Sequence, residues 1–280
     1  MAAVTEASEQ RWPPGLYVVA TPIGNLADLS PRAAECLRRA SVVAAEDTRT
    51  AGVLLRHSGS TARTVSLTEH NVTQRAPEVV AAAREGVVAL VSDAGTPVVA
   101  DPGGRLVAAA HDAGVPVFAV AGPSALTAVL SVSGFEGSDA HFLGFLPRGR
   151  AERRTRLQQA AATASVLVFF ESPNRLAETL GDVAEALGDP PVAVSREITK
   201  LHEETVRGRA SELAARFTTT RGEISVAVDV SAVGRDGTSD EVAEFMAAMQ
   251  RAGARRSAAA AEAARRFGVA KSVAYEQWEE

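Results

Sequence analysis

The chain has 280 residues, of which 46% are hydrophobic and 22% are charged, and its formal net charge is −5. This length exceeds that of an average single domain, so we expect two modest domains. The negative net charge excludes a protein that is basic throughout, although a local basic patch stays possible. The single cysteine, Cys36, excludes an internal disulfide and a zinc site built from cysteines, and it is typical of a reducing cytosol.

The chain shows no sign of a membrane segment or a secretion signal. Residues 1–14 carry two glutamates and end in Pro13-Pro14, a pattern that predicts a disordered leader. No apolar stretch approaches the roughly 20 residues that a membrane span requires. We therefore expect a cytoplasmic protein without a membrane partner.

In the first half, short apolar runs alternate with helical patterns rich in Ala and Leu. The predicted strands are 16–20, 42–45, 64–67, 87–92 and 115–120, and the predicted helices are 31–39, 48–56, 74–84 and 104–113, with a further helix that starts within 121–134 and has Ser124 as its N-cap. Strands that are apolar on both faces and alternate with helices are typical of a parallel sheet with helices on both sides. The sequence therefore predicts an N-terminal α/β domain over 15–137.

The pattern restarts after Gly137. Strands are predicted at 141–147, 165–172, 191–198 and 223–230, with helices at 148–161 and 173–187 and a short strand that leads into a helix within 203–217. Irregular spacings favour a partly antiparallel sheet in this second α/β domain, which we place at 138–230. A Gly/Ser/Asp-rich linker follows at 231–240. Residues 241–280 read as a helical module, with one helix ending at Gly268, and are compatible with a helix-turn-helix or with a packed α-hairpin.

Polar and turn-forming loops follow every strand of the first predicted sheet. They are "TPIGNLADLSPRA" (21–33), "EDTRT" (46–50), "TEHN" (68–71), "SDAGTPVVADPG" (92–103) and "AGPSA" (121–125). Ligands of open parallel sheets bind beyond the carboxyl ends of the strands. The usual phosphate-binding fingerprints and a serine nucleophile elbow are missing, and no histidines pair at metal-ligand spacing. A small polar ligand with few phosphates, and no metal, is therefore expected.

Several of these loop residues admit two interpretations. Asp93 and Asp101 are either turn formers or acceptors for a bound ligand. Asp47 either caps the helix that follows it or accepts a proton during catalysis. The arginines of the helix at 148–156, and those of the C-terminal module, either contact RNA phosphates or form solvated helix faces. The residues alone leave these alternatives open.

Eight motifs in chain order carry a resemblance to a known family. They are "LYVVATPIGNLADLSPRA", "AAEDTR", "LVSDAGTPVVADPG", "AGPSA", "GFLPR", "FFESPNRL", "REITK" and "GEISVAVD". Together they resemble the tetrapyrrole-methylase superfamily, and within it the branch that methylates ribosomal RNA. The resemblance implies the two-domain tetrapyrrole-methylase fold, a mostly parallel sheet followed by a mixed one, and a homodimer. It also implies S-adenosylmethionine as cofactor and 2′-O-methylation of a cytidine in the decoding region of 16S rRNA within the small ribosomal subunit.

The resemblance also assigns expected roles to individual residues. The expected cofactor contacts are Pro22, Val91, Ser92, Asp93, Ala94, Gly95, Thr96, Ser124, Ala125, Phe170 and Ile198. The expected proton acceptors are Asp47, Glu171 and Lys200. The expected RNA contacts are Asn25, Arg49, His70, Asn71, Arg148 and Arg175. In this reading Asp101 only shapes its loop.

Two other functions remain as alternatives at this point. Tetrapyrrole enzymes usually carry Gly-Asp-Pro where this chain has Ser92-Asp93-Ala94, so a C-methyltransferase acting on a corrin or porphyrin precursor is disfavoured. A protein that binds the cofactor and the ribosome without catalysis is the second alternative. The polar residues Asp47, Arg49 and Lys200 favour an enzyme over this binding protein.

Overall fold

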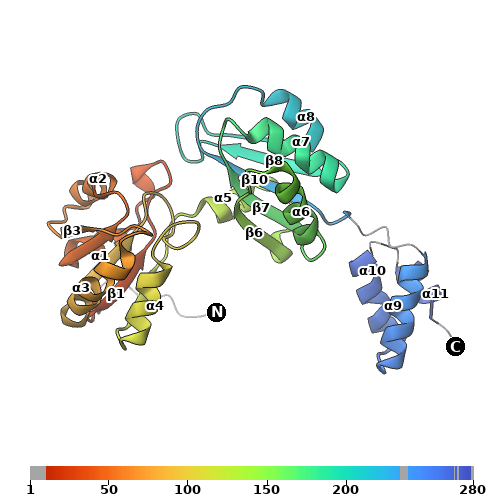
Figure 1. The fold of residues 1–280 in the computed structure, drawn as a ribbon, viewed down its shortest axis with the longest axis horizontal. Coiled ribbons are helices and arrows are strands. Elements are labelled where there is room, and N and C mark those ends of the chain that lie inside the picture. Colours follow the sequence, from red (N-terminus) through yellow and green to blue (C-terminus); the bar gives the residue numbers. More distant parts are fainter. Residues whose placement is uncertain (1–10, 234–238, 268, 270, 279–280) are drawn as a thin grey trace. The chain divides into compact units, whose positions relative to one another are not determined.

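The computed structural model describes residues 11–233, 239–267, 269 and 271–278. Residues 1–10 of the predicted leader, 234–238 of the predicted linker and Gly268, where a helix was expected to end, lie outside the described residues. The chain divides into two compact units (Figure 1). The first comprises residues 1–128 together with 197–203, and the second comprises 129–196 together with 204–280.

The first unit is built on a five-stranded parallel sheet in the order β3-β2-β4-β1-β5. Its strands are β1 (Gly15–Val19), β2 (Val42–Ala45), β3 (Arg63–Ser66), β4 (Val87–Val91) and β5 (Val117–Val120). The central strands β2 and β4 are buried along their whole length, as expected of strands with helices on both faces. The predicted parallel α/β architecture is confirmed, and all five strands end at the same edge.

Two pairs of helices cover this sheet (Figure 1). α1 (Pro31–Arg39) and α2 (Thr48–Ser58) bury Leu37 and Leu54 against one face, while α3 (Val72–Glu85) and α4 (Gly104–Asp112) bury Val79 and Leu106 against the other. Cys36 is fully buried in α1, and burial raises the pKa of its thiol to about 12. This cysteine is therefore an inert core residue.

The second unit contains a mixed five-stranded sheet in the order β6-β7-β10-β8-β9. Its strands are β6 (Ala140–Phe145), β7 (Val166–Glu171), β8 (Pro191–Arg196), β9 (Glu204–Arg209) and β10 (Ile224–Asp229). β6 pairs with β7 in parallel, while the other three pairings are antiparallel. The expected mixed sheet is thus confirmed.

Helices α6 (Arg150–Ala161), α7 (Leu176–Leu187) and α8 (Ala210–Arg216) pack on one face of this second sheet. Leu157, Leu180 and Leu213 join Phe169 and Val226 in its core. α7 begins three residues after Pro173, where a helix start was expected, because a short turn comes between them. The helix α5 (Ala125–Ser133) and two single-turn helices, η2 (Leu26–Asp28) and η3 (Gly137–Asp139), complete the described elements outside the C-terminal module.

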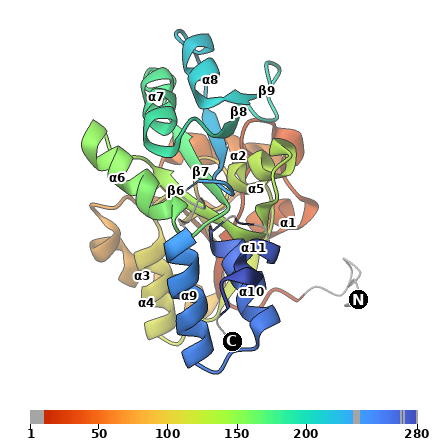
Figure 2. The same cartoon turned by 90° about the vertical axis from the view of Figure 1, so that its right-hand side faces the viewer.

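The C-terminal helices form a small cluster with a core of its own. α9 (Ser239–Arg251), α10 (Arg256–Phe267) and α11 (Lys271–Glu276) pack against one another, as Figure 2 shows. Met246 and Ala263 lie in their shared core, and the rings of Phe245 and Phe267 meet edge to face at 5.4 Å. Within the described residues, none of the helices is long and apolar enough to cross a membrane.

Candidate active site

Hydrogen bonds join three loops at the carboxyl edge of the first sheet. Thr21, after β1, forms an antiparallel bridge with Gly95, after β4, through two backbone hydrogen bonds of 2.8 and 3.1 Å. The Thr21 hydroxyl also lies 3.3 Å from the carbonyl of Ser92. Thr96 donates its hydroxyl hydrogen to the carbonyl of Pro123, after β5, at 3.2 Å. Gly95 has a φ of +83°, a left-handed conformation that favours glycine, so the glycine at this position helps the turn to form.

The backbone of this edge is open to a ligand. Asp93, Ala94 and Gly122 are exposed, and a side chain at Gly122 would lie 3.1 Å from the Cβ of Ala20. Exposed peptide groups beside a carboxylate can bind the amino and hydroxyl groups of S-adenosylmethionine without a phosphate-binding loop. The residues present therefore fit this cofactor. The cofactor contacts predicted at this edge are Pro22, Val91, Ser92, Asp93, Ala94, Gly95, Thr96, Ser124 and Ala125.

A segment from later in the chain completes the first unit. Residues 197–203 pack beside the loop that follows β1, and a Cβ at Gly24 would lie 2.6 Å from Lys200 Cγ and 3.1 Å from the Ile198 carbonyl. Lys200 pairs with Glu197 at 2.9 Å. The structure therefore brings the predicted residues Ile198 and Lys200 to the loop that carries Pro22.

Strain and unsatisfied polar atoms mark the same region. Glu197 and Thr199 both adopt left-handed backbone conformations, with φ of +52° and +68°. A β-branched residue rarely adopts this conformation, and such strain concentrates at functional sites. Thr199 Oγ1 and Asp28 Oδ2 are buried and have no hydrogen-bond partner among the described residues. These oxygens are available to a polar ligand.

The Asp47 carboxylate forms structural contacts with its neighbours in this site. Its carboxylate accepts a hydrogen bond from the backbone of Arg49 at 2.8 Å, capping α2, and pairs with the Arg49 guanidinium at 2.6 Å. Hydrogen bonds from the Arg49 side chain and backbone lower the pKa of Asp47 to about 2. The Asp47 N–H donates to Asp93 Oδ1 at 3.2 Å, which links the loops after β2 and β4. A carboxylate with this pKa is a weak base.

A pocket that the sequence did not reveal lies beside these loops. Its volume is about 550 Å³, and its walls include Glu69, His70, Val98, Asp101 and Arg105. The polar residues after β3 and β4 indicated a ligand site at this edge. The pocket itself was missed because "ADPG" is typical of a turn and Asp101 was expected only to shape its loop. Of the residues expected to contact RNA, His70 alone lines this pocket.

The two predicted asparagine contacts are engaged in turns. Asn25 caps the short helix η2 by accepting a hydrogen bond from Ala27 at 3.0 Å. Asn71 accepts one from Thr68 at 2.8 Å and donates one to the Ser66 carbonyl at 3.2 Å. Both side chains therefore have a structural task in the loops after β1 and β3.

Two further predicted residues, Phe170 and Glu171, lie in the second unit at the end of β7. The Phe170 ring meets the ring of Phe142 edge to face at 4.9 Å. The Glu171 side chain is fully buried, accepts a hydrogen bond from Thr179 at 2.7 Å and pairs with Arg175 at 3.3 Å. Arg175 also donates to the Pro147 carbonyl at 2.9 Å. Glu171 and Arg175 therefore stabilise the packing of β7 on α7.

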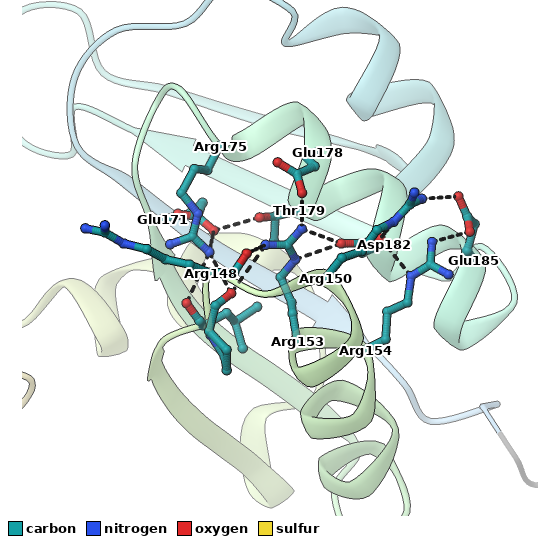
Figure 3. A network of polar contacts seen from close by, with 12 residues as sticks. Arg148, Arg150, Arg153, Arg154, Glu171, Arg175, Glu178, Thr179, Asp182 and Glu185 are labelled. Carbon is teal, nitrogen blue, oxygen red and sulfur yellow. Dashed lines mark hydrogen bonds and ion pairs between the residues drawn. The ribbon is translucent and has the colours of Figure 1, made fainter.

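The basic helix α6 contains a buried ion pair (Figure 3). Arg153 is fully buried and pairs with the equally buried Asp182 of α7 at 2.5 Å, while its other contacts include Glu178 at 2.5 Å. Burial alone would raise the pKa of Asp182, but hydrogen bonds from three arginines outweigh it and hold this pKa below its usual value. Arg153 is thus a structural residue.

Two more arginines of α6 join the same network. Arg150 pairs with Asp182 at 2.7 Å, Arg154 pairs with Asp182 at 2.7 Å, and both arginines also pair with Glu185. Arg148 and Arg156 are exposed and form no ion pair within the described part of the chain. The run of arginines is therefore mainly a clamp between α6 and α7, which leaves Arg148 and Arg156 as its solvent-facing cations.

Comparisons with known proteins decide the family. The family model of Tetrapyrrole (Corrin/Porphyrin) Methylases matches residues 15–214. The chain belongs to the tetrapyrrole methylase family. A relative named Ribosomal RNA small subunit methyltransferase I, from Mesorhizobium japonicum, is 43% identical over 98% of this chain and 95% of its own length. A protein of the same name from Thermotoga maritima is 46% identical over 75% of this chain and 96% of its own length.

Two solved structures of low sequence identity share the fold. Diphthine synthase matches 78% of this chain and 90% of its own, with a TM-score of 0.62 at 15% identity. Uroporphyrin-III C-methyltransferase from Thermus thermophilus, solved in complex with S-adenosylhomocysteine, matches 77% of this chain and 97% of its own, with a TM-score of 0.54 at 21% identity. The resemblance read from the sequence motifs, and the two-domain α/β fold that it implied, are confirmed.

The described residues contain no group of three or more His, Cys, Asp or Glu side chains that could hold a metal ion. Acidic side chains do gather at the edge of the first sheet. Burial raises the pKa of Glu46, and the charges of Asp93, Glu69 and Asp47 raise it further. This edge of the tetrapyrrole methylase fold therefore combines exposed backbone, acidic side chains and a pocket of about 550 Å³.

Proposed function

We propose that this chain transfers a methyl group from S-adenosylmethionine to the ribose 2′-hydroxyl of a cytidine in the decoding region of 16S rRNA. The observation that carries the proposal is the shared name of its relatives, which are 43% and 46% identical and are called Ribosomal RNA small subunit methyltransferase I. The turn Ser92-Asp93-Ala94, which departs from the Gly-Asp-Pro of tetrapyrrole enzymes, supports an RNA substrate. The cradle formed by the loops after β1, β4 and β5 supports the cofactor.

The cofactor would supply a methyl group that its positive sulfur already activates. The chain's task is then mainly to align this group with the acceptor and to remove a proton. The loops after β1, β4 and β5 are well suited to alignment because the hydrogen bonds of Thr21 and Thr96 hold them rigidly. Phe170 and Ile198 stay proposed cofactor contacts on the strength of the family's motifs.

The RNA contacts are proposed from exposed cations and polar groups. Arg49 has a side chain that is 90% exposed and Arg148 is also exposed, so both can reach a phosphate. His70 would meet the RNA at the mouth of the pocket. Asn25, Asn71 and Arg175 stay proposed contacts, although each already has hydrogen-bond partners within the fold.

The three proposed proton acceptors differ in their suitability. Asp47 is held ionised by Arg49, and Glu171 is fully enclosed by Thr179 and its neighbours. Lys200 pairs with Glu197, so it would have to release this partner and lose its own proton first. Each of the three is therefore already engaged by another group of the fold.

We also propose that the protein works as a cytoplasmic homodimer, with the small ribosomal subunit as its partner. The motif resemblance supports both proposals. Light scattering coupled to size-exclusion chromatography tests the dimer: a mass of one chain at micromolar concentration would contradict it.

The decisive experiment maps 2′-O-methyl groups on 16S rRNA. Purified full-length protein and methyl-labelled cofactor are incubated with small subunits that lack this modification, with naked 16S rRNA, and with a uroporphyrinogen. We expect label on one cytidine of the RNA, resistant to alkaline cleavage at its 3′ side. Label on the tetrapyrrole alone would establish the C-methyltransferase alternative, and cofactor binding without any transfer would establish the binding protein.

A further inference from the structure

We propose that the pocket beside the cofactor loops receives the acceptor nucleoside, and that Asp101 takes the proton of its 2′-hydroxyl. This proposal rests on the proposed function, which it deepens by assigning the acceptor site and the base. Asp101 belongs to neither the predicted catalytic residues nor the predicted cofactor contacts. Its position, its neighbours and the shape of the pocket carry the argument.

The pocket has the size and the lining of a site for one nucleoside. Its volume of about 550 Å³ lies in the range of small-molecule sites. Its walls combine carboxylates with an imidazole, a guanidinium and the apolar side chain of Val98. A base held in such a space has been turned out of its stack, as enzymes that modify nucleotides do. Arg105 forms no ion pair with the described residues, so its guanidinium is available for a backbone phosphate.

Asp101 stands between this pocket and the cofactor loop. Asp101 lines the pocket, and its carboxyl group is close enough to Ser92 for that hydroxyl to influence its pKa. The Ser92 hydroxyl oxygen also lies 3.1 Å from the Gly95 carbonyl oxygen, in the turn that bridges to Thr21. A nucleoside in the pocket would therefore present its ribose next to the loop that is expected to hold the methyl donor.

The segment that carries Asp101 is held in an unfavourable conformation. Val98 and Ala100 adopt left-handed backbone angles, with φ of +75° and +67°. Gly103, with a φ of +131°, leaves no room for a side chain because a Cβ there would lie 2.9 Å from Leu90. A strained loop that is locked in place by its neighbours is typical of a functional site. Asp101 lies within this strained loop.

The environment of Asp101 makes it a better base than Asp47, whose pKa is lowered to about 2. Burial raises its pKa to about 6, the hydrogen bond with Ser92 lowers it, and the charges of Glu46 and Asp93 raise it further. Glu69, His70 and Arg105 are the other titratable or charged groups that line the pocket. A base whose pKa lies near the working pH is largely ionised there and still holds a proton well.

The chemical step balances without another reactant. The 2′-oxygen forms a bond to the methyl carbon while the sulfur–methyl bond breaks, and its electron pair remains on sulfur. The hydroxyl proton passes to the Asp101 carboxylate and then to water. Before the next turnover the carboxylate is ionised again at neutral pH.

The test compares Asp101→Asn with Asp112→Asn, a matched change on the exposed last residue of α4. Single-turnover methyl transfer to unmethylated small subunits is measured from pH 5 to 8, and S-adenosylhomocysteine affinity is measured by calorimetry. We expect Asp101→Asn to lower the transfer rate by about 10²–10⁴-fold, with cofactor affinity changed by less than about threefold. Asp101→Glu should recover part of the rate, and Asp112→Asn should match the wild type.

Three results would overturn the proposal. The first is a transfer rate for Asp101→Asn within about threefold of the wild-type rate. The second is a parallel loss of S-adenosylhomocysteine affinity, which would make Asp101 a part of the cofactor site. The third is a wild-type transfer rate that stays constant when the pH is lowered from 6 to 5. The last measurement needs no variant, so it decides even if Asp101→Asn does not fold. An inactive wild type that binds S-adenosylhomocysteine would instead overturn the proposed function.

Discussion

Replacing Asp101 by Asn should make the protein more stable at neutral and alkaline pH. The carboxyl is half-buried, and its pKa is raised from 3.8 to about 6. A raised pKa means that the folded state binds its proton more tightly than the unfolded state does. The favourable contribution of Asp101 is therefore complete below pH 4 and is lost as the pH rises through 6. Asn has no charge to bury, so the variant escapes this loss.

The size of the effect follows from the pKa values. A rise from 3.8 to about 6 corresponds to about 3 kcal/mol of unfolding free energy for a carboxyl that is shielded from water. Because Asp101 is only half-buried, solvent screening reduces this value to about 1–2 kcal/mol. We expect Asp101→Asn to exceed the wild type by this amount at pH 8, relative to the difference between the two proteins at pH 4.

Urea unfolding at pH 4, 5, 6, 7 and 8 measures this difference. Trp12 reports on the first unit because its ring packs 5.3 Å from that of Tyr17, and Trp278→Phe removes the other tryptophan from the signal. Any effect of the amide itself on packing is constant with pH, so the change with pH isolates the ionisation. A difference between the two proteins that stays constant from pH 4 to 8 would refute this reasoning.

Three further predictions test the site and the second unit. Asp182→Asn should lower the unfolding free energy of the second unit by about 3 kcal/mol, since it weakens a fully buried ion pair, whereas Glu185→Gln at the exposed end of the network should cost less than about 1 kcal/mol, both measured by urea unfolding followed by far-UV circular dichroism. Gly24→Ala should weaken S-adenosylhomocysteine binding by about tenfold in calorimetry because the added methyl group displaces the Lys200 segment; unchanged affinity would separate that segment from the cofactor site. Asp47→Asn should retain methyl transfer to within about tenfold, since a carboxylate with a pKa of about 2 is a weak base, and a larger loss would return the proton-acceptor role to Asp47.

The sequence predicted the fold well because its signals were local and mutually consistent. Apolar runs such as Val87–Val91 are buried on both faces, and the pattern of alternating helices specified a parallel sheet without any knowledge of contacts. Element ends were less accurate. The strand expected to reach Ile198 stops at Arg196 because Glu197 takes a left-handed conformation. A glutamate does not predict that conformation from the sequence.

The position of the candidate site at the edge of the first sheet was predictable from the sequence, but the roles of its residues were not. Loops after parallel strands had to meet, so the meeting of Ser92, Gly95 and Thr96 with the Thr21 loop followed from topology. The ion pairs of Arg153 could not be foreseen, because its partners lie on another helix and a run of arginines gives no indication of which members are buried. Burial and pairing are properties of the packed structure, and the sequence pattern of α6 is the same in both interpretations.

The same distinction separates Asp47 and Asp101, two aspartates at the carboxyl edge of the first sheet. Both Asp47 and Asp101 follow a buried strand and precede a helix, and a motif treats them as equivalent acids. The side chain and backbone of Arg49, at the start of α2, stabilise the negative charge of Asp47. Burial and the charges of Glu46 and Asp93 destabilise the negative charge of Asp101. A protein that has to remove a proton near neutral pH gains from the second environment and not from the first. The stability that Asp101 costs the folded chain is thus the physical counterpart of its strength as a base.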